Sequence, residues 1–232
     1  MRSEAAGPGA VLITGGASGL GAAVAMAVAE AGGRPYVLDI KEPALKVEHS
    51  IVDLAQRRAT EEAVREAARR LGWLDAVVTA AGIDACGRLE EVDPRSWDRV
   101  VEVNLLGTAA VVRAALPFLE ASRGRVVTVA STLGLRALSD ATAYCASKFG
   151  VVGFTRALQV EMAGRVGVTL LVPGGMRTAF FDGRPEQYRP GPDAELNDPR
   201  NVAAAVLFAL SRPSGCEVRE LIITPEREPS WP

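Results

Sequence analysis

The segment that most constrains the fold runs from Ala10 to Glu30, because it predicts a strand, a tight turn and a helix in direct succession. The apolar run Ala10–Thr14 has the length of a buried parallel strand. A glycine-rich turn follows. The alanine-rich stretch Leu20–Glu30 then continues without proline until Gly32-Gly33, where a helix would end. A strand that enters a helix through glycines is typical of a parallel α/β sheet.

The same alternation continues along the rest of the chain. Further strands are predicted at Pro35–Asp39, Ile51–Val52, Ala76–Thr79, Arg125–Ala130, Val166–Val172 and Leu221–Ile223. Further helices are predicted at Glu61–Leu71, Pro94–Leu119, Thr142–Ala163 and Val202–Leu210. This pattern indicates one doubly wound α/β domain over residues 1–232, with a parallel sheet covered on both faces. The segment 177–199 is rich in proline, glycine and charge, and we expect a short lid there; a disordered insertion is the alternative.

The composition excludes several classes of function. With 26 basic and 28 acidic residues the formal net charge is −2, which provides no long-range field for nucleic acid or an anionic membrane. The 3 cysteines lie far apart and fit a reducing cytoplasm, and no Cys/His cluster has metal-ligand spacing. We find no signal peptide and no uninterrupted apolar run of the roughly 20 residues that a spanning helix needs. We therefore expect a cytoplasmic protein without nucleic-acid, membrane or metal partners.

The glycines of the first turn predict a phosphate-binding site. Gly15, Gly19 and Gly21 are spaced Gly-x-x-x-Gly-x-Gly between a strand and a helix. Without side chains the backbone can approach a pyrophosphate closely, and the amides and positive dipole of the following helix then face the phosphates. We interpret the turn as part of a dinucleotide site. The alternative is a turn with a structural role only.

Asp39 ends the second predicted strand, eighteen residues after Gly21. A carboxylate at this position can accept hydrogen bonds from the ribose hydroxyls of adenosine and would repel a 2′-phosphate, which favours NAD over NADP. Lys41, two residues further on, weakens that preference because its ammonium group would attract the phosphate. The alternative interpretation is that Asp39 only ends a strand at the surface.

Tyr144 and Lys148 lie four residues apart on a predicted helix, and therefore on one face of it. A lysine ammonium beside a phenol lowers the phenol pKa from roughly 10, so that the tyrosine can exchange a proton with a substrate oxygen near neutral pH. Ser131 lies thirteen residues before the tyrosine, after a predicted strand, where its hydroxyl can hydrogen-bond the same oxygen. For this pair taken alone, the alternative is that Tyr144 packs at the start of the helix and Lys148 is solvated. Asn104, inside an apolar helix, is either a satisfied core amide or a group that orients water.

With these residues the chain resembles the short-chain dehydrogenases/reductases over nearly its whole length. The matching segments are Thr14–Gly21, Asp39, Asp53-Leu54, Ala80-Ala81-Gly82, Asn104, Ser131, Tyr144, Lys148 and Pro173-Gly174 to Thr178. The resemblance implies a Rossmann-like sheet of about seven parallel strands. It also implies hydride transfer between NAD(H) and a secondary alcohol or ketone, and a homodimer or homotetramer formed through the long helices.

The resemblance assigns a role to each site residue. Tyr144 would be the general acid/base, Lys148 would hold the nicotinamide ribose and lower the pKa of Tyr144, and Ser131 would polarise the carbonyl. Asn104 would hold a water that links Lys148 to solvent. The cofactor-binding residues implied in this way are Gly15, Ser18, Gly19, Leu20, Gly21, Asp39, Asp53, Leu54, Ala80, Ala81, Gly82, Tyr144, Lys148, Pro173, Gly174, Met176 and Thr178.

Two other functions stay open at this point. One is an NADPH-dependent 3-oxoacyl thioester reductase, against which Asp39 argues. The other is a dinucleotide-binding sensor or scaffold without turnover, against which the complete set of four catalytic residues argues. Substrate contacts are expected from Thr132, Leu133, Leu138, Gly175, Met176, Phe180 and Phe181, whereas Arg136, Arg177 and Arg184 are expected to be solvated loop charges.

The chain departs from the family pattern at two places. Thr79-Ala80-Ala81-Gly82 stands where the family often has Asn-Asn-Ala-Gly, which removes two amide side chains but keeps small residues beside the cofactor. The C-terminus ends in Glu228-Pro-Ser-Trp-Pro232 instead of the Asp-Gly-Gly ending of the family's tetramers, so the subunit contacts at that end are open.

Overall fold

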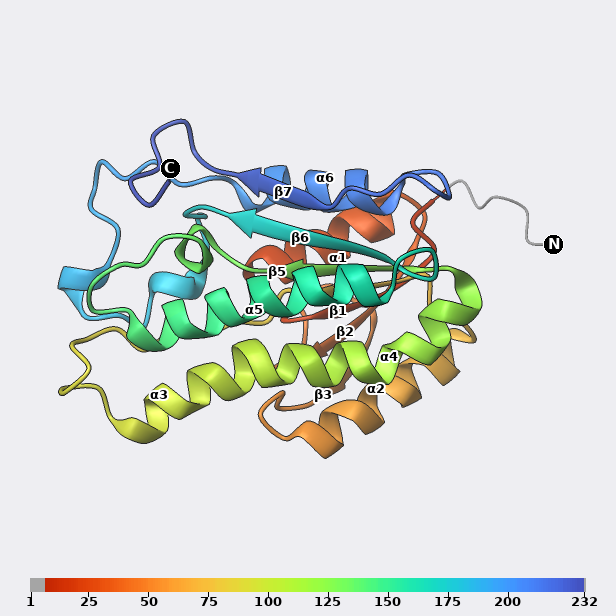
Figure 1. Ribbon diagram of the computed structural model, residues 1–232, viewed down its shortest axis with the longest axis horizontal. Coiled ribbons are helices and arrows are strands. Elements are labelled where there is room, and N and C mark those ends of the chain that lie inside the picture. Colours follow the sequence, from red (N-terminus) through yellow and green to blue (C-terminus); the bar gives the residue numbers. More distant parts are fainter. Residues whose placement is uncertain (1–6, 232) are drawn as a thin grey trace.

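The computed structural model describes residues 7–231 and contains a seven-stranded sheet with helices on both faces (Figure 1). All neighbouring strands are parallel, and their order is β3-β2-β1-β4-β5-β6-β7. The strands are β1 Ala10–Thr14, β2 Arg34–Asp39, β3 Glu48–Ile51, β4 Ala76–Thr79, β5 Arg125–Val129, β6 Gly167–Pro173 and β7 Glu220–Ile223. The predicted doubly wound α/β sheet is confirmed.

The helices form two layers. On one face α1 (Gly19–Glu30) packs beside α6 (Pro199–Leu210). The other face is covered by α2 (Arg57–Leu71), by α3 (Pro94–Val101) with its continuation α4 (Thr108–Ser122), and by α5 (Thr142–Glu161), as Figure 1 shows. The sequence predicts each of these helices, although α2 begins four residues earlier than expected.

Alternation along the strands divides the core between the two layers. In β1, Val11 and Ile13 pack with Val24 of α1 and Val206 of α6, whereas Leu12 packs on the opposite side. Every residue of β1 and β4 is buried, which is the pattern of central strands in a parallel sheet with two covered faces. Truncating Leu12 or Ile13 to alanine is expected to cost about 2–5 kcal/mol of stability.

The order of the strands also determines where the crevice of the molecule lies. The chain moves outward from β1 to β2 and β3, and then returns to β4 on the other side of β1. The loops that follow β1 and β4 therefore diverge at the carboxyl edge of the sheet, which is where doubly wound sheets bind their ligands. A cavity of about 1010 Å³ lies at this edge.

The long helix predicted at Pro94–Leu119 is continuous but not regular. Asp93 caps it by accepting a hydrogen bond from the Ser96 amide at 2.9 Å, and residues Glu102–Gly107 form a π-helical turn, η1, between α3 and α4. Regular α-helix was therefore the wrong prediction for this turn. The wider turn contains Asn104, whose side chain bonds the main chain of Ile83 in the loop after β4. π-Helical turns of this kind are frequent at functional sites.

The span Pro94–Ser122 is long and apolar enough, by length and composition alone, to cross a membrane. In the fold, 56% of its most apolar window is buried inside the protein. The segment is therefore a core helix that packs against the sheet and against α2 and α5.

Candidate functional site

The cavity at the carboxyl edge collects the residues that the sequence singled out. Its wall includes every predicted catalytic and cofactor-binding residue except Gly21 and Asn104. It also includes all seven predicted substrate-contact residues. A volume of about 1010 Å³ has room for a dinucleotide together with a small substrate.

The glycine turn is held in a conformation that only glycine adopts easily. Gly15 has φ +70°, and a Cβ there would lie 2.7 Å from the Cα of Ala81 in the loop after β4. Gly21 lies beneath the turn, where a Cβ would collide with the carbonyl of Gly15. Gly21 lies outside the cavity wall, where its missing side chain lets α1 pack closely on the turn, and its contact with the cofactor remains a prediction. Ser18 is exposed at the N-cap of α1 and makes no capping hydrogen bond with its side chain.

Asp39 connects the end of β2 to the glycine turn. Its Oδ2 accepts a hydrogen bond from the Ala17 amide at 2.9 Å, and its Oδ1 accepts one from the Lys41 amide at 3.0 Å. The carboxylate lies in the cavity wall, so each oxygen retains a lone pair for a further donor from a ligand. Asp39 is thus more than a surface carboxylate at a strand end.

Asp53 and Leu54 lie on the same side of the cavity as Asp39. The Asp53 carboxylate pairs with Arg99 of α3 at 2.9 Å, and Leu54 is buried against Gly107 of the π-helical turn. The ion pair is partly exposed and adds little to stability. These contacts border the end of the cavity where the adenine is expected.

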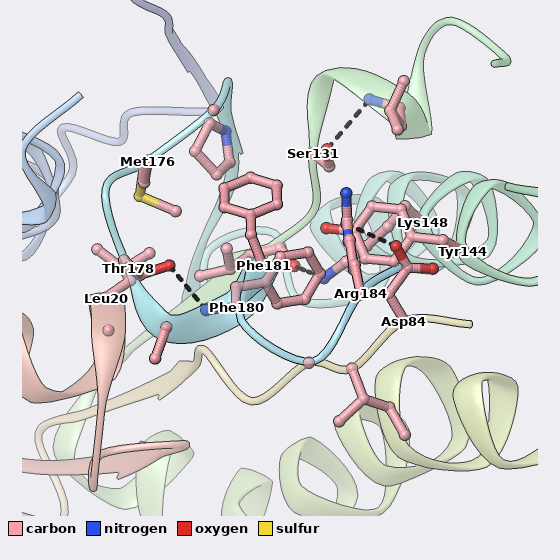
Figure 2. Close-up of a pocket in the computed structure, with 18 of the residues that line it drawn as sticks. Leu20, Asp84, Ser131, Tyr144, Lys148, Met176, Thr178, Phe180, Phe181 and Arg184 are labelled. Carbon is pink, nitrogen blue, oxygen red and sulfur yellow. Dashed lines mark hydrogen bonds and ion pairs between the residues drawn. The ribbon is translucent and has the colours of Figure 1, made fainter. Parts of the chain in front are cut away.

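Tyr144 and Lys148 project from α5 into the cavity, and Ser131 follows β5 beside them (Figure 2). The Lys148 Nζ donates to the Val129 carbonyl at 2.9 Å and lies 5.6 Å from the centroid of the Tyr144 ring. The Ser131 Oγ accepts a hydrogen bond from the Leu133 amide at 3.1 Å, which caps a short 3₁₀ turn, η2 (Thr132–Gly134). The Ser131 hydroxyl also hydrogen-bonds Tyr144, so the two hydroxyl groups meet in the same part of the cavity.

The pKa values of this pair differ from the prediction. Burial raises the pKa of Tyr144 above its usual 10, and the hydrogen bond with Ser131 opposes that rise only in part. Burial also lowers the pKa of Lys148 to about 8. The expected lowering of the Tyr144 pKa is thus absent in the protein by itself, because burial of the phenol outweighs the hydrogen bond with Ser131 and the charge of Arg184.

Asn104 is buried and fully hydrogen-bonded. Its Nδ2 donates to the Ile83 carbonyl at 2.9 Å and to the Ser147 Oγ at 3.0 Å, while its Oδ1 accepts from the Ile83 amide at 2.9 Å. These bonds match the interpretation of Asn104 as a core amide whose polar groups are hydrogen-bonded. A Cβ at Gly82 would lie 3.6 Å from both the Asn104 Oδ1 and the Lys148 Nζ, so the absent side chain leaves the two groups facing one space. Water binding by Asn104 remains a prediction.

Thr178 and Met176 belong to the segment after β6. A Cβ at Gly19 would lie 3.4 Å from the Thr178 side chain, so this segment reaches the glycine turn across the cavity. Thr178 also caps a 3₁₀ turn, η3 (Ala179–Phe181), and Met176 pairs with Asn197 at the other end of the lid segment. A second 3₁₀ turn, η4, spans Glu186–Tyr188.

Arg184 is not the solvated loop charge that the sequence suggested. Its guanidinium pairs with Asp84 at 2.6 Å, and the side chains are only 18% and 6% exposed. The guanidinium stacks over Phe180 and Phe181, with 4.9 and 4.6 Å to their ring centroids, and Phe180 lies 5.6 Å from the Tyr144 ring. Figure 2 shows this stack in front of the catalytic pair. The segment predicted to be a lid is thus held beside Tyr144 by an ion pair that the sequence did not predict.

Asp84 also accepts a hydrogen bond from the Cys86 thiol and contributes to its raised pKa. The Cys86 Sγ donates to the Asp84 Oδ2 at 3.1 Å, and burial together with this carboxylate raises the pKa of Cys86 to about 12. The sequence feature that could have identified Asp84 as a site residue is its position two residues after Gly82, at the carboxyl edge of β4. Among residues 7–231, no group of three or more His, Cys, Asp or Glu side chains is placed to hold a metal ion.

The C-terminal residues Arg227 to Ser230 also line the cavity, which the sequence did not predict. Their side chains contact the segment after β6, the turn after Ser131 and the lid. Nothing in their composition indicated a place in the site, since the tail lies more than eighty residues from Tyr144 in the sequence.

Comparison with known proteins agrees with this geometry. A family model described as short chain dehydrogenase matches residues 9–189. An uncharacterized oxidoreductase of Staphylococcus aureus (strain MW2) is 31% identical over 226 residues, covering 92% of this chain and 96% of that protein. An L-fucose dehydrogenase of Mus musculus is 33% identical over 239 residues, covering 92% of this chain and 86% of that protein.

Solved structures give the same fold. An alcohol dehydrogenase from the archaeon Thermococcus sibiricus, complexed with 5-hydroxy-NADP, superposes with a TM-score of 0.81 at 27% identity and covers 92% of this chain and 95% of that one. The ligand-free aldohexose dehydrogenase of Thermoplasma acidophilum has a TM-score of 0.83 at 24% identity, with coverage of 93% and 92%, a likeness that concerns the fold alone.

Proposed function

This chain belongs to the short-chain dehydrogenase/reductase family of oxidoreductases acting on alcohols, and we propose that it transfers hydride between NAD(H) and a secondary alcohol or ketone. The observation that carries the proposal is the convergence of Ser131, Tyr144 and Lys148 on one cavity wall. The same cavity continues to a glycine turn whose backbone is open to phosphate.

The cavity residues fit a dinucleotide. Gly15 and Gly19 have no side chains that would keep a phosphate away from the turn, and the Asp39 carboxylate lies at the ribose end. Ser18 and Thr178 would contact the phosphates, and Asp53 and Leu54 would border the adenine. When bound, the nicotinamide ring supplies or accepts the hydride.

The protein's own residues would handle the substrate oxygen. The Leu133 amide and the hydrogen bond with Tyr144 hold the Ser131 hydroxyl in place, and a substrate oxygen that displaces the phenol oxygen as its acceptor would have its developing charge stabilised there. Tyr144 would pass a proton between its hydroxyl and the same oxygen. Because its pKa is raised, Tyr144 is protonated at neutral pH, which is the state that donates the proton during carbonyl reduction. Lys148 would hold the nicotinamide ribose.

Asp39 supports the preference for NAD over NADP. Its two oxygens are fixed by the amides of Ala17 and Lys41, so the carboxylate cannot easily turn away from a 2′-phosphate. The exposed Lys41 side chain would act in the opposite direction. The comparison of kcat/KM for NADH and NADPH decides between the two effects. A large preference for NADPH would contradict the proposal and favour the 3-oxoacyl thioester reductase.

The substrate end of the cavity combines aromatic and polar groups. Phe180 and Phe181 lie beside the Asp84–Arg184 pair at Tyr144, so a compact alcohol with further hydroxyl groups would find both an apolar wall and hydrogen-bond partners. A panel of secondary alcohols, sugars and ketones, followed by nicotinamide absorbance, identifies the substrate class. Dinucleotide binding without turnover on any of them would favour the sensor or scaffold.

The long helices carry the surface on which we expect self-association. Leu106 of η1 and Phe149 and Val160 of α5 are exposed apolar side chains on the helices that the family pairs. We propose a homodimer or homotetramer in the cytoplasm. Light scattering on the purified protein measures the oligomeric state, and a monomer at micromolar concentration would contradict this part of the proposal.

A further inference from the structure

We propose that residues Arg227–Ser230 of the C-terminal tail, Pro225–Trp231, form a wall of the active site, and that Glu228 and Ser230 are positioning residues for the two sides of the cavity. The inference rests on the proposed function. Figure 1 shows that the C-terminal end and the lid segment lie at the same end of the molecule, beyond the carboxyl ends of the strands. Residues Arg227 to Ser230 form part of the cavity wall.

Glu228 holds the segment that is expected to border the nicotinamide. Its Oε2 accepts a hydrogen bond from the Gly175 amide at 2.7 Å. A Cβ at Gly174 would collide with the same carboxylate, so the tail packs directly on the backbone of residues 174 and 175. A hydrogen bond to an ionised acceptor is stronger than one between neutral groups, so Glu228 fixes where this backbone lies.

Ser230 connects the tail to the loop of the catalytic serine. The Ser230 Oγ lies 2.7 Å from the Thr132 Oγ1, and Thr132 is the buried residue directly after Ser131. Glu228 also orients Ser230, because its Oε1 accepts hydrogen bonds from the Ser230 amide at 3.1 Å and from the Ser230 Oγ at 2.6 Å. One carboxylate therefore couples the Gly175 side of the cavity to the Ser131 side.

The tail is anchored at its start and against the lid. Pro225 is buried, and the Ile223 carbonyl just before it accepts a hydrogen bond from the Gly174 amide at 2.9 Å. Arg227 pairs with Glu195 of the lid segment at 3.3 Å. This ion pair is exposed, so the inference depends on Glu228 and Ser230 and not on Arg227.

These contacts predict that the two residues have separable effects. Glu228 acts on the backbone beside the cofactor, so its loss is expected to weaken dinucleotide binding as well as turnover. Ser230 acts through Thr132 on the position of Ser131, so its loss is expected to lower kcat with little change in dinucleotide affinity. A residue that only stabilises the fold would not produce this division.

The experiment compares Glu228→Ala, Glu228→Gln and Ser230→Ala with Glu226→Ala, an exposed glutamate on the same tail. NADH or NADPH binding is measured by fluorescence titration, kcat and KM by steady-state kinetics, and folding by the melting temperature. We expect Glu228→Ala to weaken dinucleotide binding about tenfold, and Ser230→Ala to lower kcat about tenfold at nearly unchanged affinity. Glu228→Gln retains an acceptor for the Gly175 amide and should recover most of the binding.

The inference is overturned if all three variants match Glu226→Ala in dinucleotide affinity and kcat. If Glu228→Ala does not fold, the kcat and the dinucleotide affinity of Ser230→Ala decide the question. Failure of the proposed function has a different signature, because the wild-type protein would then bind neither dinucleotide or would bind one without turnover of any substrate in the panel. If the wild-type protein binds a dinucleotide, and neither the affinity of the Glu228 variants nor the kcat of Ser230→Ala differs from wild type, only the proposed role of the tail is rejected.

Discussion

The two halves of the cavity are built from different kinds of contact. In the half that contains the glycine turn, main-chain amides of the loops donate to residues at the ends of neighbouring strands, as when the Ala81 amide donates to the Thr14 Oγ1 at 3.2 Å and the Ala17 amide to the Asp39 carboxylate. In the half that contains Tyr144, side chains meet from segments 98 and 100 residues apart, namely Thr132 with Ser230 and Asp84 with Arg184.

The two halves therefore place different requirements on their residues. The cofactor half needs main-chain amides that are open to the cofactor. It also needs small residues, because larger side chains at these positions would collide with neighbouring atoms. The substrate half needs side chains with the right charge and shape, and several of them can be exchanged without disturbing the backbone. Substitutions in the two halves should therefore affect cofactor binding and substrate turnover separately.

The largest effect is expected for Tyr144→Phe in the substrate half. The variant lacks the hydroxyl that exchanges the proton, so kcat should fall by about 10²–10⁴. The ring remains in place beside Phe180, and dinucleotide binding should stay within about twofold of wild type. Steady-state kinetics and fluorescence titration with NADH measure the two quantities. Turnover at the wild-type rate would remove Tyr144 from the reaction.

In the cofactor half, Gly15→Ala should abolish tight dinucleotide binding. The new Cβ would lie 2.7 Å from the Ala81 Cα at a residue with φ +70°, so the turn must shift, and a misplacement of about 1 Å costs about a hundredfold. The matched control is Gly153→Ala on α5, where nothing lies within 4 Å of the added Cβ. The control should bind normally and gain about 0.5–1 kcal/mol of stability. Equal binding by both variants would refute the role of the turn.

Lys148, where the two halves meet, predicts a dependence of stability on pH. Its pKa is about 8 in the folded protein and near 10.5 when unfolded, so the unfolded chain binds more protons between these values. The free energy of unfolding should therefore rise from pH 8 to pH 10 by up to about 3 kcal/mol from this group. Tyr144, whose pKa is raised, opposes the trend only above pH 10. Urea denaturation of wild type and Lys148→Met tests this, because the variant should lack the rise.

Asp39→Asn should change the choice of cofactor. The variant keeps a side chain that can bond the turn but loses the negative charge, so the ratio of kcat/KM for NADH over NADPH should fall about tenfold, or about 1.4 kcal/mol. Kinetics with both cofactors give the ratio. Lys41→Ala is the complementary variant and should move the ratio in the opposite direction. An unchanged ratio in Asp39→Asn would remove this carboxylate from cofactor selection.

The smallest effect is expected at the lid. Arg184→Gln removes the charge that partners Asp84, whose side chain is only 6% exposed, and the lid should open more readily over Tyr144. We expect KM for the substrate to change about threefold to tenfold while dinucleotide affinity stays constant. The double variant Asp84→Asn/Arg184→Gln should be closer to wild type in melting temperature than Arg184→Gln. A change in dinucleotide affinity instead would show that the lid belongs to the cofactor half.

The sequence predicted the cofactor half better than the substrate half. The order strand, glycines, helix is enough to place Gly15, Gly19 and Asp39 in one wall, because the strands β1 and β2 that carry them are neighbours in the sheet. The glycine pattern alone does not set Gly21 apart from Gly15 and Gly19, because a glycine needed for packing and one needed for ligand approach look the same in a sequence. The ion pair of Arg184 was also missed, since nothing near that residue indicates a partner 100 positions away.

The local sequence by itself determined the strands, the helices and the placement of Tyr144 and Lys148 on one helical face, because these depend on periodicity and on residues a few positions apart. Only the tertiary structure decided the direction of the Tyr144 pKa shift, the pairing of Asp84 with Arg184 and the place of Glu228 in the cavity. Burial and contacts between distant segments are properties of the packed chain, and they arise only when the loops that follow separate strands meet at one edge of the sheet.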